Sequence, residues 1–528
     1  MWLGNCTYAE AFRYDQLLTL LRASSSSTRY LPTKTTALLL GLVLGLPTQT
    51  LLADSSTQTV GKLEFSSCKI GTAPAQIEAL CAQFEVPLNP LDSSAGTVAL
   101  SIARIPSRRQ SSHTDAVTFL AGGPGQSAIE TYPGVAFAFR HINRDRDVVL
   151  VDQRGTGQSL PLDCDESTDG SSLDANLSLQ DDPQKIAQQA AECLAQLPAD
   201  PRFFTTSIAV QDLENLRQQL GITQWNLYGI SYGTRVAAHY LRRYPDAVRS
   251  VVLDAVVPPQ ISLGPDIAQL AQQSLDHIFA RCEADAGCGE AFGNLSDDTL
   301  DLIENLQNTP RTLTYEDIAT GKRKTRSFTH NDLAITLRLM SYSSQTAAIL
   351  PSMLFEAIDN DNLAPLARQA DMLSTSLSGS LASGMHHAII CTEDAPFFTD
   401  ELARSENTVS YMGSNVLSAV AATCDQWPAG VMDDDFKEPL VSGIPALILS
   451  GAADPITPPV YGDLLAETLT RSRHIVNEAQ GHMQAPFGCM PSLMAQFIDT
   501  PDPDLLDVEC LERLRPTPFF VDANGPLP

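Results

Sequence analysis

The chain has 528 residues, of which 43% are hydrophobic and 18% are charged, and its formal net charge is -28. A chain of this length and composition can bury a large core, so one large domain with an insertion, or two domains, is expected. The excess of acidic residues argues against nucleic acid and against anionic membrane surfaces as partners.

The first 53 residues have the features of an export signal. Basic residues at Arg22, Arg29 and Lys34 precede an apolar run from Ala37 to Leu46. This run is shorter than the roughly 20 residues that span a bilayer, so it predicts a signal segment rather than a membrane span. We therefore expect an exported protein, periplasmic or secreted, with no membrane integration after the signal is removed.

Cysteine usage agrees with export. Cys6 lies in the signal segment, and the other ten cysteines form five close sequential pairs. An even number of cysteines in an exported chain favours disulfides, although the sequence leaves other connectivities open. The predicted bonds are Cys68–Cys81, Cys164–Cys193, Cys282–Cys288, Cys391–Cys424 and Cys489–Cys510. The spacing does not match a structural zinc site, and no metal is expected.

Short apolar runs that predict strands occur in the sequence both before and after a long, mainly helical segment. Three β-like runs lie near the start, and the last two alternate apolar and polar positions as antiparallel strands do. Denser apolar runs further on, separated by helical segments, favour a parallel sheet covered on both faces. The predicted strands are 60–65, 80–86, 97–105, 116–120, 147–151, 225–230, 249–254, 445–450 and 473–477.

Between the two groups of strands, residues 256–432 contain mainly helical segments, and we call them the cap. An insertion at this place is typical of a lid that covers a site and selects substrates. The predicted organisation is a signal segment (1–53), a first core segment (54–255), the cap (256–432) and a C-terminal core segment (433–528).

The pentapeptide Gly229-Ile230-Ser231-Tyr232-Gly233 stands between a predicted buried strand and a predicted helix. A strand, one sharp turn and a helix around Gly-x-Ser-x-Gly form a nucleophile elbow, in which the glycines let strand and helix approach closely. This context predicts that Ser231 is a nucleophile. The pentapeptide alone is weak evidence, since many such matches are ordinary turns.

A serine nucleophile needs a histidine base and a carboxylate that orients it. In the α/β-hydrolase fold these follow in the order Ser, Asp, His, each after a strand. Asp454 and His482 each follow a predicted strand and a glycine, and none of the other histidines has this placement. The triad Ser231, Asp454 and His482 is therefore predicted, with the cap accounting for the long gap before Asp454.

Acyl transfer also needs donors for the oxyanion. The backbone N–H after the nucleophile belongs to Tyr232. A glycine cluster, 122–125, follows the predicted strand 116–120, and it supplies the second donor, for which Gly123 is the best candidate. In the next loop Arg154 is expected to bind neighbouring carbonyl or carboxylate groups in a structural role.

These motifs together resemble the α/β-hydrolase peptidases, namely the proline iminopeptidases and, more closely, the secreted tripeptidyl aminopeptidases. The resemblance rests on 122–125, Asp152-Gln153-Arg154-Gly-x-Gly-x-Ser (152–159), 229–233, Asp454 and His482. One departure is Ala121, where iminopeptidases usually carry histidine. The resemblance implies recognition of a free α-amino group by acidic cap residues, for which Glu393 and Asp394 are the candidates.

The resulting hypothesis is an exported serine aminopeptidase that acts on peptides with a free N-terminus and needs no cofactor. A carboxylesterase or lipase on the same scaffold is the alternative, because it shares the triad. A non-catalytic binding protein is a third possibility, which the intact triad disfavours. The sequence leaves the length of the released fragment, the side-chain preference and the oligomeric state open.

Overall fold

The computed structural model describes residues 57–109, 113–164, 182–318, 320–398, 410–413, 416–522 and 524–526. The predicted signal segment, 1–53, lies outside these described residues. Residues 55–528 belong to one compact unit.

A ten-stranded sheet forms the centre of this unit, in the order β1-β2-β3-β4-β6-β5-β7-β8-β11-β12. The pairs from β1 to β6 are antiparallel, and those from β6 to β12 are parallel. The strands are β1 (Gln58–Val60), β2 (Leu63–Ile70), β3 (Ile77–Asn89), β4 (Asp92–Ile105), β5 (Ala116–Leu120), β6 (Val148–Val151), β7 (Trp225–Ile230), β8 (Val248–Asp254), β11 (Ala446–Gly451) and β12 (Ser472–Asn477). This is the predicted mostly parallel sheet with antiparallel strands at its start.

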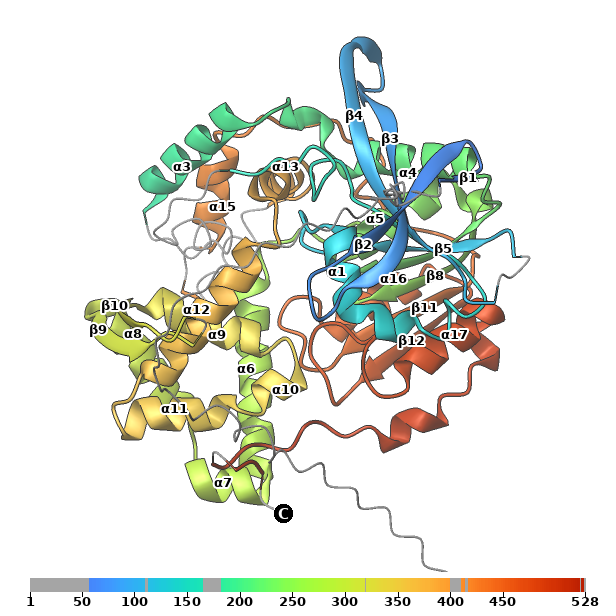
Figure 1. The fold of residues 1–528 in the computed structure, drawn as a ribbon. Coiled ribbons are helices and arrows are strands. Elements are labelled where there is room, and N and C mark those ends of the chain that lie inside the picture. The colour runs from blue at the N-terminus through green and yellow to red at the C-terminus, as the bar shows by residue number, and fades with distance from the viewer. Residues whose placement is uncertain are drawn as a thin grey trace, which may run out of the picture. The chain divides into compact units, whose positions relative to one another are not determined.

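Helices cover both faces of the sheet (Figure 1). One hydrophobic cluster joins the sheet to α4 (Thr206–Leu220) and α5 (Tyr232–Arg243). A second cluster joins the opposite face to α1 (Ala128–Val135) and α17 (Met490–Asp499). The strands β7 and β11 are buried along their whole length, which explains why their sequences are continuously apolar. Further helices of this part are α3 (Pro183–Gln196), α16 (Pro459–Ala466), η1 (Ala136–Phe139), η2 (Pro201–Phe203), η3 (Pro245–Ala247), η6 (Pro503–Leu505) and η7 (Glu509–Arg513).

The cap is mainly helical, as predicted, but it also contains a two-stranded hairpin of β9 (Arg311–Glu316) and β10 (Arg323–Phe328). A separate hydrophobic cluster holds most of the cap together. Its helices are α6 (Ile267–Ala284), α7 (Ala286–Phe292), α8 (Ser296–Asn308), α9 (His330–Met340), α10 (Ser344–Ala347), α11 (Leu350–Asp359), α12 (Ala364–Ser378), α13 (Ser383–Glu393), η4 (Ala395–Phe397) and α15 (Val416–Cys424). Helix α13 packs on the same face of the sheet as α4 and α5, because its apolar side chains belong to their cluster.

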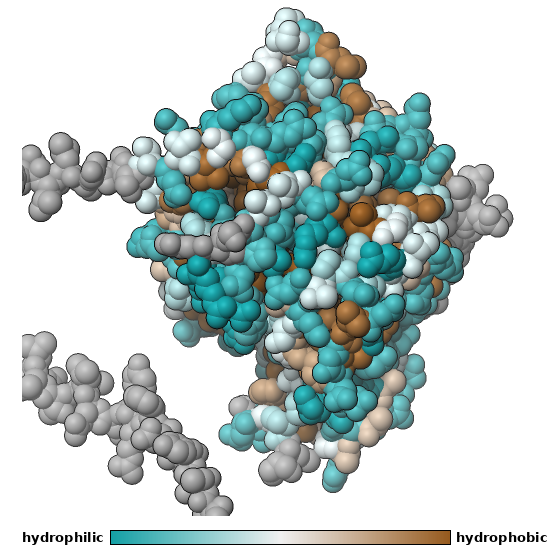
Figure 2. Space-filling view, turned by 90° about the vertical axis from the view of Figure 1, so that its right-hand side faces the viewer, coloured by the Kyte–Doolittle hydropathy of each residue, from teal (hydrophilic) through white to brown (hydrophobic). Residues whose placement is uncertain are grey.

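The face of the molecule drawn in Figure 2 is largely hydrophilic, and its hydrophobic residues form several separate small patches. This agrees with the acidic composition of the chain. A search of the described helices finds none that is both long enough and apolar enough to cross a membrane.

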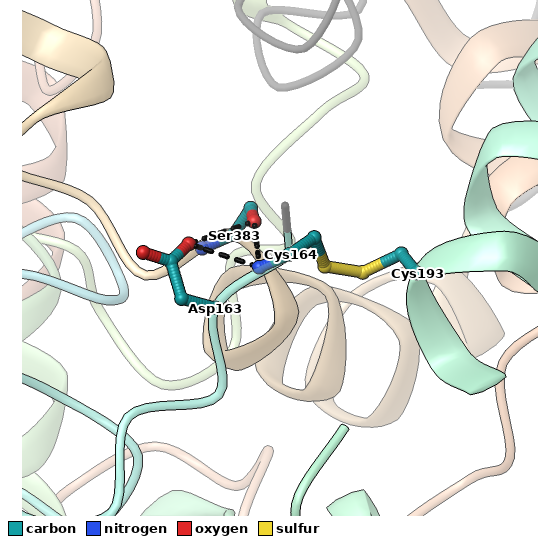
Figure 3. Close-up of a disulfide and its surroundings, with 4 residues drawn as sticks. All are labelled: Asp163, Cys164, Cys193 and Ser383. Atoms are coloured by element: carbon teal, nitrogen blue, oxygen red, sulfur yellow. Dashed lines mark hydrogen bonds between the residues drawn. A yellow bond between two sulfur atoms is a disulfide. The ribbon is translucent and has the colours of Figure 1, made fainter. Parts of the chain in front are cut away.

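All five predicted disulfides are present. The Cys164–Cys193 bond connects the loop after β6 to α3 (Figure 3). Beside it, the Asp163 carboxylate accepts hydrogen bonds from the backbone N–H and the hydroxyl of Ser383, the first residue of α13. This contact and the Cys391–Cys424 bond at the other end of α13 anchor that helix at both ends.

Candidate active site

Ser231 occupies the sharp turn between β7 and α5. Its backbone is in a strained conformation, with φ 53° and ψ -125°, in the left-handed half of φ space that residues with a Cβ seldom adopt. The Ser231 N–H donates to the Asp254 carbonyl oxygen at 3.0 Å, and its own carbonyl oxygen accepts from Thr234. Ser231 is partly exposed although the strand and helix on either side of it are buried. These features are those of a nucleophile elbow.

The glycines around Ser231 are needed for close packing. A Cβ atom on Gly229 would lie 2.3 Å from the Gly233 carbonyl oxygen, and one on Gly233 would lie 2.1 Å from the Leu120 carbonyl oxygen. Both distances are far inside van der Waals contact, so no larger residue fits without moving the backbone. The Gly-x-Ser-x-Gly pattern is thus explained by the approach of α5 to β7 and to the neighbouring β5.

The glycine loop after β5 lies against the elbow. A Cβ atom on Gly122 would be 3.2 Å from the Ser231 Cβ atom. Gly123 has a positive φ of 106° and is exposed, whereas Gly122 and Gly125 are buried. The cap covers the far side of this loop, since Ala382 donates to the Gly125 carbonyl oxygen at 3.0 Å. The predicted second donor, Gly123, therefore stands in the loop that adjoins Ser231.

His482 and Asp454 lie together at the ends of β12 and β11. The Nδ1 atom of His482 is 2.8 Å from Oδ2 of Asp454. The other carboxylate oxygen of Asp454 accepts the backbone N–H groups of Ile456 and Thr457, both at 2.9 Å, which fix its orientation. Burial lowers the pKa of His482, but the charge and hydrogen bond of Asp454 outweigh burial, and the net pKa is raised above its ordinary value.

A buried carboxylate links the histidine loop to the elbow. Asp254 ends β8, and its carboxylate accepts the backbone N–H groups of Gln484 and Ala485 as well as the hydroxyl of Tyr228. The same residue receives the Ser231 N–H on its carbonyl oxygen. Burial raises the pKa of Asp254 to about 6, against the effect of these hydrogen bonds. The role of Asp254 could not be predicted from the sequence, since an aspartate at the end of a strand carries no signal of its own.

The cap also contacts the histidine loop. The backbone N–H of His482 donates to the Tyr342 carbonyl oxygen at 2.8 Å, and the two rings lie 5.0 Å apart. A Cβ atom on Gly481 would approach the carbonyl oxygens of Ser341 and Tyr342 to within 2.6 and 2.8 Å. The glycine before His482 therefore lets the segment after α9 pack directly on the predicted base.

A second Ser-His-Asp arrangement occurs on the sheet and has to be distinguished from the first. His474 lies 2.9 Å from the hydroxyl of Ser450 and 2.8 Å from the carboxylate of Asp463. Ser450 lies near the end of β11, next to the edge strand β12, and is 0% exposed, whereas Ser231 is partly exposed. Its backbone is that of a regular strand, unlike the strained turn at Ser231. This arrangement is therefore a structural hydrogen-bond chain.

Glu393, a predicted substrate-binding residue, is fully buried at the end of α13. Its carboxylate accepts the backbone N–H and the hydroxyl of Thr206, and that hydroxyl lies 2.7 Å from the Tyr232 hydroxyl. Burial raises the pKa of Glu393 to about 7, although Arg235 acts in the opposite direction. Thr206 thus links Glu393 to Tyr232 through hydrogen bonds, and Tyr232 is the residue after the predicted nucleophile.

Asp394 has a different environment from its neighbour. Its carboxylate accepts two hydrogen bonds from Arg235, both at 2.9 Å, one from the Leu263 N–H and one from Lys437. Burial would raise its pKa, but Arg235 and Lys437 hold it below the ordinary value. Four donors occupy the acceptor sites of this carboxylate, so the arrangement does not favour the predicted contact of Asp394 with a substrate amine.

Arg154 has the structural role that the sequence predicts. It pairs with Asp212 through two hydrogen bonds and donates to the carbonyl oxygens of Pro87, Leu88 and Phe203. Among the described residues, no three His, Cys, Asp or Glu side chains gather in a way that could hold a metal ion.

Comparisons with known proteins agree with the fold. A family model described as alpha/beta hydrolase fold matches residues 115–279, and one described as TAP-like protein matches residues 409–510. The chain is 25% identical to Serine protease Hip1 of Mycobacterium tuberculosis over 446 residues, which are 78% of this chain and 83% of that protein.

Two other relatives match over shorter stretches. The chain is 28% identical to the Putative hydrolase YuaR of Escherichia coli over 253 residues, 44% of this chain, and spans about half (49%) of the length of that protein. It is 29% identical to the Tripeptidyl aminopeptidase of Streptomyces lividans over 217 residues, 36% of this chain and 38% of that protein. The chain therefore has the α/β-hydrolase fold, and the proteins it resembles include ones named serine protease, tripeptidyl aminopeptidase and proline iminopeptidase.

Proposed function

We propose that the protein is an exported serine exopeptidase that removes residues from the free N-terminus of peptides. The observation that carries this proposal is the strained Ser231 turn, joined through Asp254 to the loop of the His482–Asp454 pair. In the proposed reaction, His482 takes the Ser231 proton as the hydroxyl attacks the scissile carbonyl. Asp454 orients His482, and the same histidine then protonates the leaving amine. Water releases the N-terminal fragment from the acyl-enzyme.

The backbone N–H groups of Tyr232 and Gly123 are the proposed donors to the oxyanion. Tyr232 is the first residue of α5, so its N–H is one of the helix N-terminal donors that lack an intrahelical partner. Gly123 supports the role through its exposure and its place in the loop that packs on Ser231. One such donor is worth roughly 3–4 kcal/mol in the transition state.

Glu393 is the proposed partner of the substrate ammonium group. Burial raises the pKa of Glu393 to about 7, and a substrate ammonium beside it would stabilise the charged carboxylate. Asp394 receives a different proposed role: its four donors make it the residue that holds Arg235 and Lys437 in place. Arg235 in turn lies 3.8 Å from Glu393 and limits its negative charge.

Matched substrates test the reaction class. Peptidyl arylamides with a free amino end should be cleaved, and their acetylated counterparts and simple acyl esters should be poor substrates. Glu393→Gln should raise KM for the free-amine substrates and leave the residual rate on acetylated ones unaffected. Faster turnover of acyl esters than of any arylamide would instead assign the site to a carboxylesterase or lipase.

Export is the remaining part of the proposal. It is supported by the five disulfides, which persist in oxidising compartments, and by the signal-like composition of residues 1–53. Fractionation of cells that express the full chain, with sequencing of the mature N-terminus, tests it.

A further inference from the structure

One helix of the cap, α13, is connected to the segments of both proposed oxyanion donors. Its last residue, Glu393, binds the hydroxyl of Thr206, which lies 2.7 Å from the Tyr232 hydroxyl. Where the helix begins, residues 381–386 lie along the glycine loop that contains Gly123. The two proposed donors come from different loops of the core, so α13 is a single element that can fix one relative to the other.

The start of α13 pairs with the glycine loop through its backbone. The Ala382 N–H donates to the Gly125 carbonyl oxygen at 3.0 Å, and Leu381 forms an antiparallel bridge with Gln126. A Cβ atom on Gly123 would lie 3.1 Å from Cδ1 of Leu381, and one on Gly125 would lie 2.7 Å from the Ala382 carbonyl oxygen. The loop therefore cannot shift without breaking contacts with the cap.

The His386 side chain adds a direct hydrogen bond to this loop. Its Nδ1 atom lies 3.3 Å from the carbonyl oxygen of Pro124, the residue after Gly123. A carbonyl oxygen only accepts, so Nδ1 carries the proton and donates it. Burial lowers the pKa of His386 to about 4, so the imidazole is neutral at pH 7 and the hydrogen bond to Pro124 selects its tautomer. The next residue, His387, has a different neighbour, because its ring lies 5.1 Å from that of Trp427.

We propose that His386 is a positioning residue, which holds the glycine loop so that the Gly123 N–H points to the oxyanion beside Ser231. This inference rests on the proposed function and adds a connection between the cap and the reaction step. The oxyanion forms only as the reaction proceeds, so loss of the hydrogen bond should lower kcat and leave KM nearly unchanged. Complete loss of one donor lowers kcat by about 10²–10³, and a displaced donor should cost less, about five- to fiftyfold.

Three substitutions of His386 separate the hydrogen bond from the shape of the side chain. His386→Phe keeps a ring and removes the donor. His386→Asn keeps an N–H donor on a nitrogen attached to Cγ, as Nδ1 is, whereas His386→Gln carries its N–H one atom further out. His387→Phe is the matched control, since it replaces the adjacent histidine of the same helix.

Two inhibitors report on the oxyanion site apart from ground-state binding. A peptidyl aldehyde forms a hemiacetal oxyanion with a serine nucleophile, and the corresponding peptidyl alcohol does not. The Ki of each is measured for all variants, together with kcat and KM for a free-amine peptidyl arylamide of the same sequence. Titration of active sites with a fluorophosphonate probe corrects kcat for any loss of folded protein.

The proposal predicts that His386→Phe lowers kcat and raises the Ki of the aldehyde by similar factors, with KM and the Ki of the alcohol nearly unchanged. His386→Asn should recover most of the loss, His386→Gln should not, and His387→Phe should match the wild type. An unchanged kcat in His386→Phe, no recovery in His386→Asn, or equal changes in both Ki values would overturn the positioning role. Peptide cleavage by the wild type would uphold the proposed function in each of these cases, and absence of any cleavage would overturn both.

Discussion

The Asp254 carboxylate accepts the backbone N–H of Gln484 through both of its oxygens, at 2.8 and 3.0 Å, across 230 residues of sequence. Gln484 is two residues after His482, and the Asp254 carbonyl oxygen receives the N–H of Ser231. One buried residue thus fixes the backbone on either side of the candidate nucleophile–base pair. The hydrogen bonds of Asp254 and its negative charge can be tested separately by substitution.

Asp254→Asn should shift the pH profile while the protein keeps its fold. The amide oxygen can take the place of Oδ2, which accepts from Tyr228, Gln484 and Ala485, so these three hydrogen bonds are retained, while the Gln484 contact to Oδ1 and the charge are lost. Burial lowers the pKa of His482, Asp454 raises it, and Asp254 raises it further. Without the Asp254 charge, the acid limb of kcat/KM should move to lower pH.

Two variants serve as references for that shift. Asp254→Ala leaves the N–H groups of Gln484 and Ala485 unsatisfied and should lower the free energy of unfolding by about 2–4 kcal/mol, as measured in urea. Asp463→Asn neutralises the carboxylate of the other His-Asp pair and should leave the acid limb where it is. If the acid limb does not move in Asp254→Asn, the Asp254 charge does not raise the pKa of His482.

Gly233→Ala should destabilise the protein strongly, because its Cβ atom would lie 2.1 Å from the Leu120 carbonyl oxygen. The expected loss is about 3 kcal/mol, measured by urea denaturation. Gly134→Ala is the control, since a Cβ atom there meets no atom within 4 Å and the residue lies in α1. That change should be neutral or stabilising by up to about 1 kcal/mol. Equal effects of the two substitutions would be inconsistent with the close approach of α5 to β5.

Glu393→Gln should change the pH dependence of stability. Burial raises the pKa of Glu393 to about 7 in the folded protein, whereas the ordinary value is 4.5. Between these two pH values the folded state holds a proton that the unfolded state releases, so the carboxyl group makes the wild type less stable as pH rises. The unfolding free energy of Glu393→Gln relative to the wild type should therefore rise across this window, on the order of 2–3 kcal/mol. A difference that stays constant from pH 4.5 to 7.5 would argue against a raised pKa.

The disulfides should differ in their contribution to stability. Cys391–Cys424 closes 33 residues of sequence and ties α13 to the end of α15, whereas Cys282–Cys288 closes 6. On loop-closure entropy, removal of the first pair by double alanine substitution should cost about 4 kcal/mol and removal of the second about 2 kcal/mol. Thermal unfolding of the two double variants measures this order, and a larger loss for the shorter loop would contradict it.

The sequence predicted the parts of the site that follow local rules. Ser231, Asp454 and His482 could be proposed because each follows a strand and a glycine, and the structure explains those glycines by close backbone contacts at Gly229, Gly451 and Gly481. The five sequential disulfides and the structural role of Arg154 are confirmed for the same reason: they depend on short spacing or on a buried loop. The parallel sheet could be predicted because strands that are buried on both faces, such as β7 and β11, have continuously apolar sequences.

The parts that sequence analysis missed depend on contacts between distant segments. Thr206 meets Glu393 across 187 residues, and Arg235 meets Asp394 across 159, so neither pair leaves a local pattern. The sequence places Glu393 and Asp394 in one acidic cap motif, yet their carboxylates accept hydrogen bonds from different residues, Thr206 and Arg235. The hairpin of β9 and β10 was missed because its side chains are mostly exposed and polar.

Replacement of Ser231 by alanine tests the central claim most directly. The measurement is turnover of a free-amine peptidyl arylamide, together with labelling of the wild type and Ser231→Ala by a fluorophosphonate probe and a thermal melt of each. We predict labelling of the wild type at Ser231, no labelling and no turnover in Ser231→Ala, and nearly equal Tm values. Full turnover by folded Ser231→Ala, or labelling that persists at another serine, would contradict the assignment of Ser231 as the nucleophile.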